Sequence, residues 1–569
     1  MKSIILKTTA FSSLAASIIF AYLYYSRKLE SEKKKEKSEI DFSKIGELNE
    51  LDAKIIALSN DYLSEATELL KSLINFSPNS QDPLLGTSNH EESRLLFLKN
   101  EILRLGAVLN PNDISFDPYG NLVWTILDPD DPIPINQRKV IYLNAHADIS
   151  PASSSEWNQK IDSGIDPYLG ITDIGKVNFD SVERELGIKL PPARDWNHLI
   201  FGAGATTLQG LVSIVFASKI LIETRSLSSL RGTVVRAVAS VSCEVNPPGS
   251  AHHILQKQRL EPFQIPDCIL LSSPSFSSIS LVEYNQALLE TQTIETHPLL
   301  SPSKQAKNKL IQDQLAPSPF IPKLQIYTSG RGRCELEIQL HGKSCLETGV
   351  RLVSEGIGKI CHSLKNLKDI ENSFELIFTN AQFTGCGSVP VHYSLSVERR
   401  LSSMDDSLVA VKELENFQTL KNARKEGFLG EVRVKRYTGK TWKGILSDNL
   451  KEIRAWTTPT NDIAVKAAIE SFRRTGAQGS LSAEIGETQR GDGCGYVLTT
   501  REGNVDMWKD KAWINEGKFV HPPMIGFGAG NEKIRGKVGE FVDSREIWAP
   551  IAMMARFPSV FSKMKKNSV

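Results

Sequence analysis

Val140-Ile-Tyr-Leu-Asn-Ala-His146-Ala-Asp148 is a mostly apolar run that ends in His-x-Asp. An apolar run of this length predicts a strand that is buried on both faces, as in a parallel sheet between layers of helices. At the carboxyl end of such a strand, an imidazole can bind a metal ion while a nearby carboxylate orients its ring. His146 is therefore a candidate metal ligand and Asp148 a candidate orienting group. An ordinary strand end is the alternative interpretation.

The composition excludes some classes of protein. The chain has 569 residues, of which 23% are charged and 40% hydrophobic, and its formal net charge is +1. This length is enough for two or more domains with a large core. Because phosphate contacts need clustered Lys and Arg, the near-neutral charge gives no reason to expect a nucleic-acid partner. The seven cysteines are widely spaced without a Cys-x-x-Cys pair, which indicates reduced core residues in a cytosol-like compartment.

The amino-terminal segment predicts a membrane anchor. Residues 8–26 contain no charged side chain, and as a helix they would cross about one bilayer core. More basic residues follow this segment than precede it, so the large domain is expected to face the cytosol. We predict a transmembrane anchor over residues 1–28, in the mitochondrial outer membrane or endoplasmic reticulum, and a charged stalk over residues 29–45. The alternatives are a cleaved secretory signal, a mitochondrial transit peptide and a buried helix.

From residue 51 onward, helical and strand patterns alternate, which is typical of an α/β domain. Strands are predicted at 122–127, 139–145, 233–241 and 267–271, and helices at 91–105 and 212–222. A glycine-rich turn, Phe201-Gly-Ala-Gly-Ala-Thr-Thr-Leu-Gln-Gly-Leu211, leads into the second of these helices. Its glycines would let another backbone come close to the start of the helix.

Further motifs follow in a fixed order: Trp157 with Asp166-Pro-Tyr-Leu-Gly170, then Gly330-Arg-Gly-Arg333, Glu398-Arg-Arg-Leu401 and Gly526-Phe-Gly-Ala-Gly530. Together with the His-x-Asp and the glycine-rich turn, they resemble the dinuclear-zinc amidohydrolases and metallopeptidases, such as acetylornithine deacetylase, succinyl-diaminopimelate desuccinylase and glutamate carboxypeptidase. The resemblance covers most of the chain from residue 50 to residue 560. It implies an α/β/α catalytic-type domain over residues 46–329 and 440–569, with an inserted α+β lid over residues 330–439. In relatives such a lid often pairs subunits, so a homodimer through the lid is expected.

The resemblance also implies two zinc ions that share one carboxylate, with a glutamate as general base. His146 keeps the first ligand, and Asp148 keeps its orienting acid. Four other ligand positions of the family are replaced here, by Thr207, Ser273, Leu346 and, for the last metal histidine, a position near Gly536. The glutamate pair of the family falls on Cys243-Glu244, so either the base or one ligand is missing.

These replacements leave too few ligands, because each catalytic zinc uses three protein ligands and a water. Cys243 could complete a mononuclear site with His146 and Glu244, but that site would have no free base. We predict a membrane-anchored, catalytically degenerate protein without a zinc cofactor, in which Asp148 and Glu244 are vestigial and which acts by binding a ligand or partner. The alternatives are an active zinc-dependent hydrolase of amide or peptide bonds and a structural subunit of a membrane complex.

Three other features bear on binding. Arg400 falls on a lid position where an arginine of the family often meets a substrate carboxylate, and an ion pair within the lid, for example with Glu398, is the alternative. Gln489-Arg-Gly-Asp-Gly-Cys494 matches the glycine loop that closes the pocket in relatives. Two insertions, at residues 171–197 and 285–323, lie near the expected mouth of the cleft and are candidate surfaces for a protein partner.

Overall fold

The computed structural model describes part of the chain. The described residues are 48–76, 89–150, 152–161, 166–170, 177–190, 193–241, 243, 254–255, 260–277, 323–342, 351, 353–360, 362, 377–384, 392–401, 406–476, 481–488, 492–499, 511–514 and 519–564. The expected anchor, the stalk, Glu244, Leu346 and nearly all of the insertion at 285–323 lie outside them.

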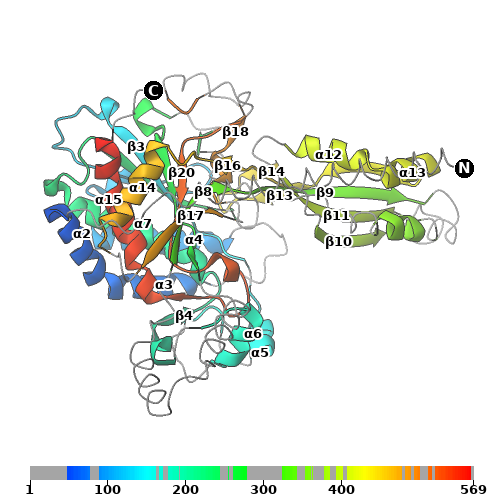
Figure 1. Cartoon of the computed structure of the whole chain (residues 1–569), viewed down its shortest axis with the longest axis horizontal. Coiled ribbons are helices and arrows are strands. Elements are labelled where there is room, and N and C mark those ends of the chain that lie inside the picture. Colours follow the sequence, from blue (N-terminus) through cyan, green and yellow to red (C-terminus); the bar gives the residue numbers. More distant parts are fainter. Residues whose placement is uncertain are drawn as a thin grey trace, which may run out of the picture.

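A ten-stranded sheet forms the centre of the body (Figure 1). Its main order is β1-β2-β5-β3-β6-β20-β8-β16, and β7 and β17 each pair with β8. The strands are β1 (Ile114–Phe116), β2 (Leu122–Leu127), β3 (Lys139–His146), β5 (Thr233–Ser240), β6 (Cys268–Leu271), β7 (Phe276–Ser277), β8 (Lys323–Gly330), β16 (Trp456–Thr457), β17 (Ser482–Thr488) and β20 (Met524–Gly526). Because β3 lies between β5 and β6 and parallel to both, its carboxyl end is in the middle of the sheet.

The strand that ends in His146 is apolar because both of its faces are covered. Every residue of β3 except Lys139 is buried. Ile141 and Leu143 pack into one hydrophobic cluster, whereas Val140 and Tyr142 pack into another. This alternation between two clusters explains why the run shows no polar period and confirms the predicted α/β fold.

Helices cover the sheet and fix the position of the glycine-rich turn. They include α2 (Glu50–Asp61), α3 (Leu63–Ile74), α4 (Asn89–Leu105), α5 (Ser154–Ile161), α6 (Phe179–Leu186), α7 (Ala205–Glu223), α14 (Ile463–Arg473) and α15 (Trp548–Lys563). The central helix α7 packs against β3, α3 and α15. It begins seven residues earlier than predicted because Gly204, with φ 76°, lets the chain turn into the helix soon after β4 (Leu199–Phe201).

Within the described part of the chain, α7 is the one helix that is long and apolar enough to cross a membrane. However, 94% of its most apolar window is buried inside the protein. Its composition is therefore explained by its place in the core.

The lid is a second sheet with its own core, and it projects from the body (Figure 1). Its strand order is β10-β11-β9-β12, with β15 also paired to β9. The elements are β9 (Gly332–His341), β10 (Ile377–Thr384), β11 (His392–Leu401), α12 (Ser407–Glu415), α13 (Gln418–Glu426), β12 (Leu429–Val434) and β15 (Glu452–Ile453). Along β9 buried and half-buried residues alternate strictly, as expected for a sheet with one face covered by helices.

Candidate functional site

His146 lies at the carboxyl end of β3 and is buried, with 7% of its surface exposed. Its Nδ1 lies 3.1 Å from a carboxylate oxygen of Asp148 and 3.1 Å from the backbone oxygen of the same residue. Both oxygens can only accept, so Nδ1 carries the proton and Nε2 presents its lone pair. In metal sites a carboxylate orients a ligating imidazole in this way.

The Nε2 atom of His146 is 3.8 Å from Oδ1 of Asp492, which is too far for a hydrogen bond. It contacts Nη2 of Arg535, whose side chain is 3% exposed. Arg535 follows the short 3-10 helix η10 (Glu532–Ile534) and directly precedes Gly536, near which the resemblance placed the last metal histidine. A cation that belongs to the chain therefore occupies the nitrogen that would bind zinc.

Arg535 also binds Asp492, which belongs to the loop before the 3-10 helix η8 (Cys494–Tyr496). Nη1 of Arg535 donates to both carboxylate oxygens of Asp492, at 3.0 and 2.8 Å. Burial alone would raise the pKa of Asp492, but Arg535 and the other polar neighbours lower it to about 2. Asp492 is thus ionised at neutral pH, and the two side chains form a buried ion pair beside His146.

Glu540 fixes the loop that carries Arg535. This buried carboxylate accepts hydrogen bonds from the backbone amide of Gly204, from the hydroxyl of Thr206 at 2.8 Å and from the backbone amide of Gly536 at 3.2 Å. Gly204 caps the amino end of α7, where a negative charge is favourable. The glycine-rich turn and the Arg535 loop are therefore held together by one side chain.

The remaining family positions offer poor metal ligands. Thr207 is buried in the first turn of α7, and Ser273 is buried directly after β6. The Cys243 thiol lies 3.4 Å from the Ser240 hydroxyl. Burial, and secondarily the charge of Asp148, raise the pKa of Cys243 well above its usual value, so its thiol is protonated at neutral pH.

Arg400 lies in the lid on β11, opposite Arg333 of β9. Glu398, the suggested alternative partner of Arg400, lies 3.5 Å from Arg333. The preceding residue, Arg399, is buried and forms an ion pair with Glu413 of α12. A substrate-binding role for Arg400 therefore stays a prediction.

The residues present do not fit the dinuclear zinc centre of the family. Among the residues that the structure describes, no group of three or more His, Cys, Asp or Glu side chains is placed to hold a metal ion. Thr207 and Ser273 carry hydroxyls where zinc uses carboxylate, imidazole or thiolate ligands. The guanidinium of Arg535 can only donate hydrogen bonds, so it competes with a metal for His146.

Neither Arg535 nor Asp492 is predicted from the sequence. Neither one occupies a ligand position of the family, and they are separated from each other by 43 positions. The sequence does contain an arginine next to the position that the resemblance gives to the last metal histidine. It also contains an aspartate in the glycine loop at residues 489–494. Buried polar groups need hydrogen-bond partners, and Arg535 supplies one to Nε2 of His146.

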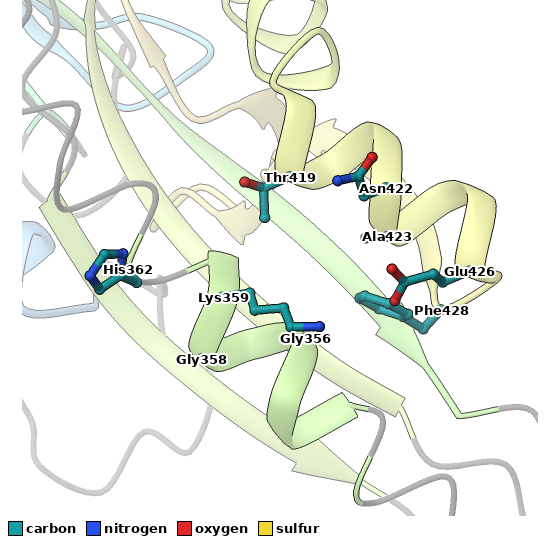
Figure 2. A pocket seen from close by; sticks show the side chains of 9 residues that line it. All are labelled: Gly356, Gly358, Lys359, His362, Thr419, Asn422, Ala423, Glu426 and Phe428. Atoms are coloured by element: carbon teal, nitrogen blue, oxygen red, sulfur yellow. The ribbon is translucent and has the colours of Figure 1, made fainter.

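A groove of about 550 Å³ lies in the lid, between the helical residues 353–360 and α13 (Figure 2). Lys359 from the first helix and Glu426 from the second line it, and Phe428 closes its floor. Because these residues all belong to the lid, the groove is separate from the site around His146.

Comparisons with solved structures identify proteins that share this architecture. No family model matches the sequence, and no curated protein matches it. Human carnosine dipeptidase 1 aligns with 91% of this chain and 100% of its own, at 12% identity and a TM-score of 0.51. The dipeptidase Dug1p of Saccharomyces cerevisiae aligns with 90% of this chain and 99% of its own, at 11% identity and a TM-score of 0.52.

A third similar structure is described as a member of a named family. The M20 family metallo-carboxypeptidase Sso-CP2 of Sulfolobus solfataricus aligns with 88% of this chain and 100% of its own, at 12% identity and a TM-score of 0.50. This chain has the M20 metallopeptidase fold. The resemblance inferred from the sequence is thus confirmed as a shared fold, which includes both the body and the lid. At this identity the M20 fold says nothing about catalysis.

Proposed function

We propose that this protein is a catalytically degenerate relative of the M20 hydrolases that acts by binding a partner or ligand. The observation that carries the proposal is the guanidinium of Arg535 on Nε2 of His146. In an active site of this fold, that nitrogen would have to bind zinc. Here it accepts a hydrogen bond from the chain itself.

The charges around His146 support the same conclusion. A zinc centre needs several negative ligands around its cations, whereas here one guanidinium is neutralised by one carboxylate, Asp492. The pair satisfies its own hydrogen bonds, and the lone pair of His146 is used as well. Because Arg535 and His146 are both buried, a substrate carbonyl would have to displace this network to reach the imidazole.

The insertion at residues 171–197 supports a binding role. In its described part, Phe179 of α6 stacks on Trp196 with ring centroids 3.5 Å apart, and Val182 and Leu186 are buried. Phe179 also packs edge-on against Phe201 of β4, and all three side chains of α6 belong to the main hydrophobic cluster, so α6 is held on the body. We assign the partner contact to this insertion, with residues 285–323 as the second candidate.

Membrane attachment belongs to the same proposal. It rests on the uncharged stretch at residues 8–26 and on the basic residues that follow it. The large domain would face the cytosol from the mitochondrial outer membrane or the endoplasmic reticulum. A homodimer through the lid is a further part of the proposal, supported by the open groove beside α13.

The test is the zinc content of the full chain after dialysis against a zinc buffer, measured by elemental analysis beside a His146→Ala variant. We expect the same zinc content in both proteins, because Nε2 of His146 is already used. Near-stoichiometric zinc that disappears in the His146→Ala variant would overturn the proposal and favour the active hydrolase.

A second arm measures hydrolysis of a panel of dipeptides and N-acyl amino acids by the wild type and by a Glu244→Gln variant. We expect no turnover above that of a sample without enzyme, and therefore no effect of the substitution. Turnover by the wild type that is abolished in the Glu244→Gln variant would contradict the proposal. If the protein is instead a subunit of a membrane complex, it will migrate at the mass of that complex after mild detergent extraction.

A further inference from the structure

Two histidines face each other at the end of the lid sheet that lies away from the body (Figure 1). His341 is the last residue of β9 and His392 the first of β11, and they are directly opposite in the antiparallel ladder. Their Nδ1 atoms lie 3.2 Å apart, and their rings are nearly perpendicular, at 81°. His392 is exposed and His341 is half-buried, so ions in solution can reach the pair.

The spacing of the two nitrogens fits a shared metal ion. Imidazole nitrogens bind zinc at roughly 2.0–2.1 Å, which separates two of them by about 3.3 Å in a tetrahedral site. In a square-planar site with similar bond lengths the separation would be about 2.9 Å. The observed 3.2 Å falls between these values. A hydrogen bond between two neutral imidazoles has a similar length, so the spacing alone does not distinguish the two cases.

The packing of His341 supplies an independent observation. A Cβ atom added to Gly430 of β12 would lie only 2.0 Å from Nε2 of His341, so the ring in this position leaves no room for a side chain at residue 430. The pairing of β12 with β9 shifts register between Leu429 and Glu431, which makes Gly430 the bulged residue. Bulges are recurrent devices for aiming a side chain. Here the bulge seats Nε2 of His341 against the backbone and leaves Nδ1 directed at His392.

We propose that His341 and His392 form a two-histidine site for a divalent transition metal that prefers imidazole ligands. By the general order of affinities Cu²⁺ binds most tightly, and Ni²⁺ and Zn²⁺ bind more weakly. The ion takes the lone pairs of both Nδ1 atoms, and the proton that lay between them moves through water to Nε2 of the ring that carried it. Water or a ligand from another molecule completes its coordination. Mg²⁺ and Ca²⁺ are excluded because they select oxygen ligands.

The bound ion would link the last residue of β9 to the first residue of β11, at one end of the lid sheet. This site is independent of the proposed function, since His341 and His392 lie in the lid whereas His146 lies in the body. The two ideas can therefore fail separately. Zinc lost on substitution of His146 would count against the degenerate site, and metal lost on substitution of His392 would support the lid site.

The test is a titration of the full chain with CuCl₂, followed by calorimetry and by electron paramagnetic resonance. We expect one tight Cu²⁺ per chain with nitrogen hyperfine structure from two imidazoles. His341→Ala and His392→Ala should each weaken binding by at least about tenfold, since even the loss of a group that only orients a ligand costs that much. His198→Ala, which removes an exposed histidine elsewhere, is the matched control and should bind like the wild type.

A Gly430→Ala variant sharpens the test because it keeps both histidines. Its new methyl group should displace the ring of His341 and weaken Cu²⁺ binding, while circular dichroism shows that the fold is retained. Titration with MgCl₂ should give no signal. The proposal is overturned if the wild type binds no Cu²⁺, or if the His341→Ala and His392→Ala variants bind it as tightly as the His198→Ala control.

Discussion

The histidine at the centre of the body and the histidine pair on the lid differ in what their ring nitrogens contact. Both nitrogens of His146 are engaged within the chain, by Asp148 and Arg535. His341 and His392 turn their Nδ1 atoms toward each other at the surface. The histidine in the body thus has an internal cation on Nε2, whereas the lid pair is open to a cation from solution. The type of residue alone does not reveal which of them binds metal.

The largest expected effect comes from removing the internal cation. Arg535→Ala leaves Asp492 ionised and buried without its partner, which should lower the free energy of unfolding by about 3–5 kcal/mol. Arg545→Ala is the control, because Arg545 pairs with Asp543 at the surface and should cost about 1 kcal/mol or less. Urea denaturation of both variants checks this. Equal losses in the two would mean that the body site is not closed by Arg535.

A smaller loss is expected when the Arg535 loop is released. Glu540→Gln keeps the shape of the side chain but removes the charge that accepts three hydrogen bonds, which should cost about 2–3 kcal/mol. Glu156→Gln, on the exposed face of α5, should change stability by less than about 0.5 kcal/mol. Thermal unfolding followed by circular dichroism measures both. If Glu540→Gln leaves the unfolding temperature unchanged, Glu540 does not hold the loop that carries Arg535.

The pH dependence of stability should report the ionisation of Asp492. Its folded pKa of about 2 lies below its usual 3.8, so its contribution is present above pH 3.8 and is lost as the pH falls toward 2. The shift corresponds to about 2 kcal/mol. Asp492→Asn should flatten this part of the stability curve, measured by urea midpoints between pH 2 and pH 7. An unchanged slope would contradict the buried ion pair.

The smallest effect should be that of a chelator. Dialysis of the chain against EDTA should leave its unfolding temperature unchanged. The cation beside His146 is the side chain of Arg535, which a chelator cannot remove. After loading with Cu²⁺, the same treatment should reverse any stabilisation gained through the lid pair. A large fall in the unfolding temperature of the unloaded protein would instead indicate that a metal ion stabilises the body.

The fold was accessible from sequence because its signals are local. The apolar run into His146 and the alternation along β9 reflect burial on two faces and on one face, and each is visible within ten residues. The start of α7 was misplaced by seven residues because apolar periodicity begins after the turn, whereas the helix begins where the positive φ of Gly204 permits it. Such boundaries depend on backbone geometry more than on composition.

The site was accessible only in part. His146 and Asp148 belong to one motif, so their proximity follows from the sequence. Arg535 is 389 positions from His146, and no local pattern connects them. The partner of Nε2 in His146 depends on which distant side chain can reach it, and that is decided by the packing of the segment after β20.

The ion pair beside His146 also limits how a zinc site could be built at this position. Introducing an acid at Thr207 or Ser273 alone would not free Nε2 of His146, while removing Arg535 alone would leave Asp492 without its counter-charge. Each single substitution toward a zinc site therefore carries a loss of stability or no gain in metal binding. Under the proposed function, Arg535 therefore keeps a metal centre out of reach of single substitutions.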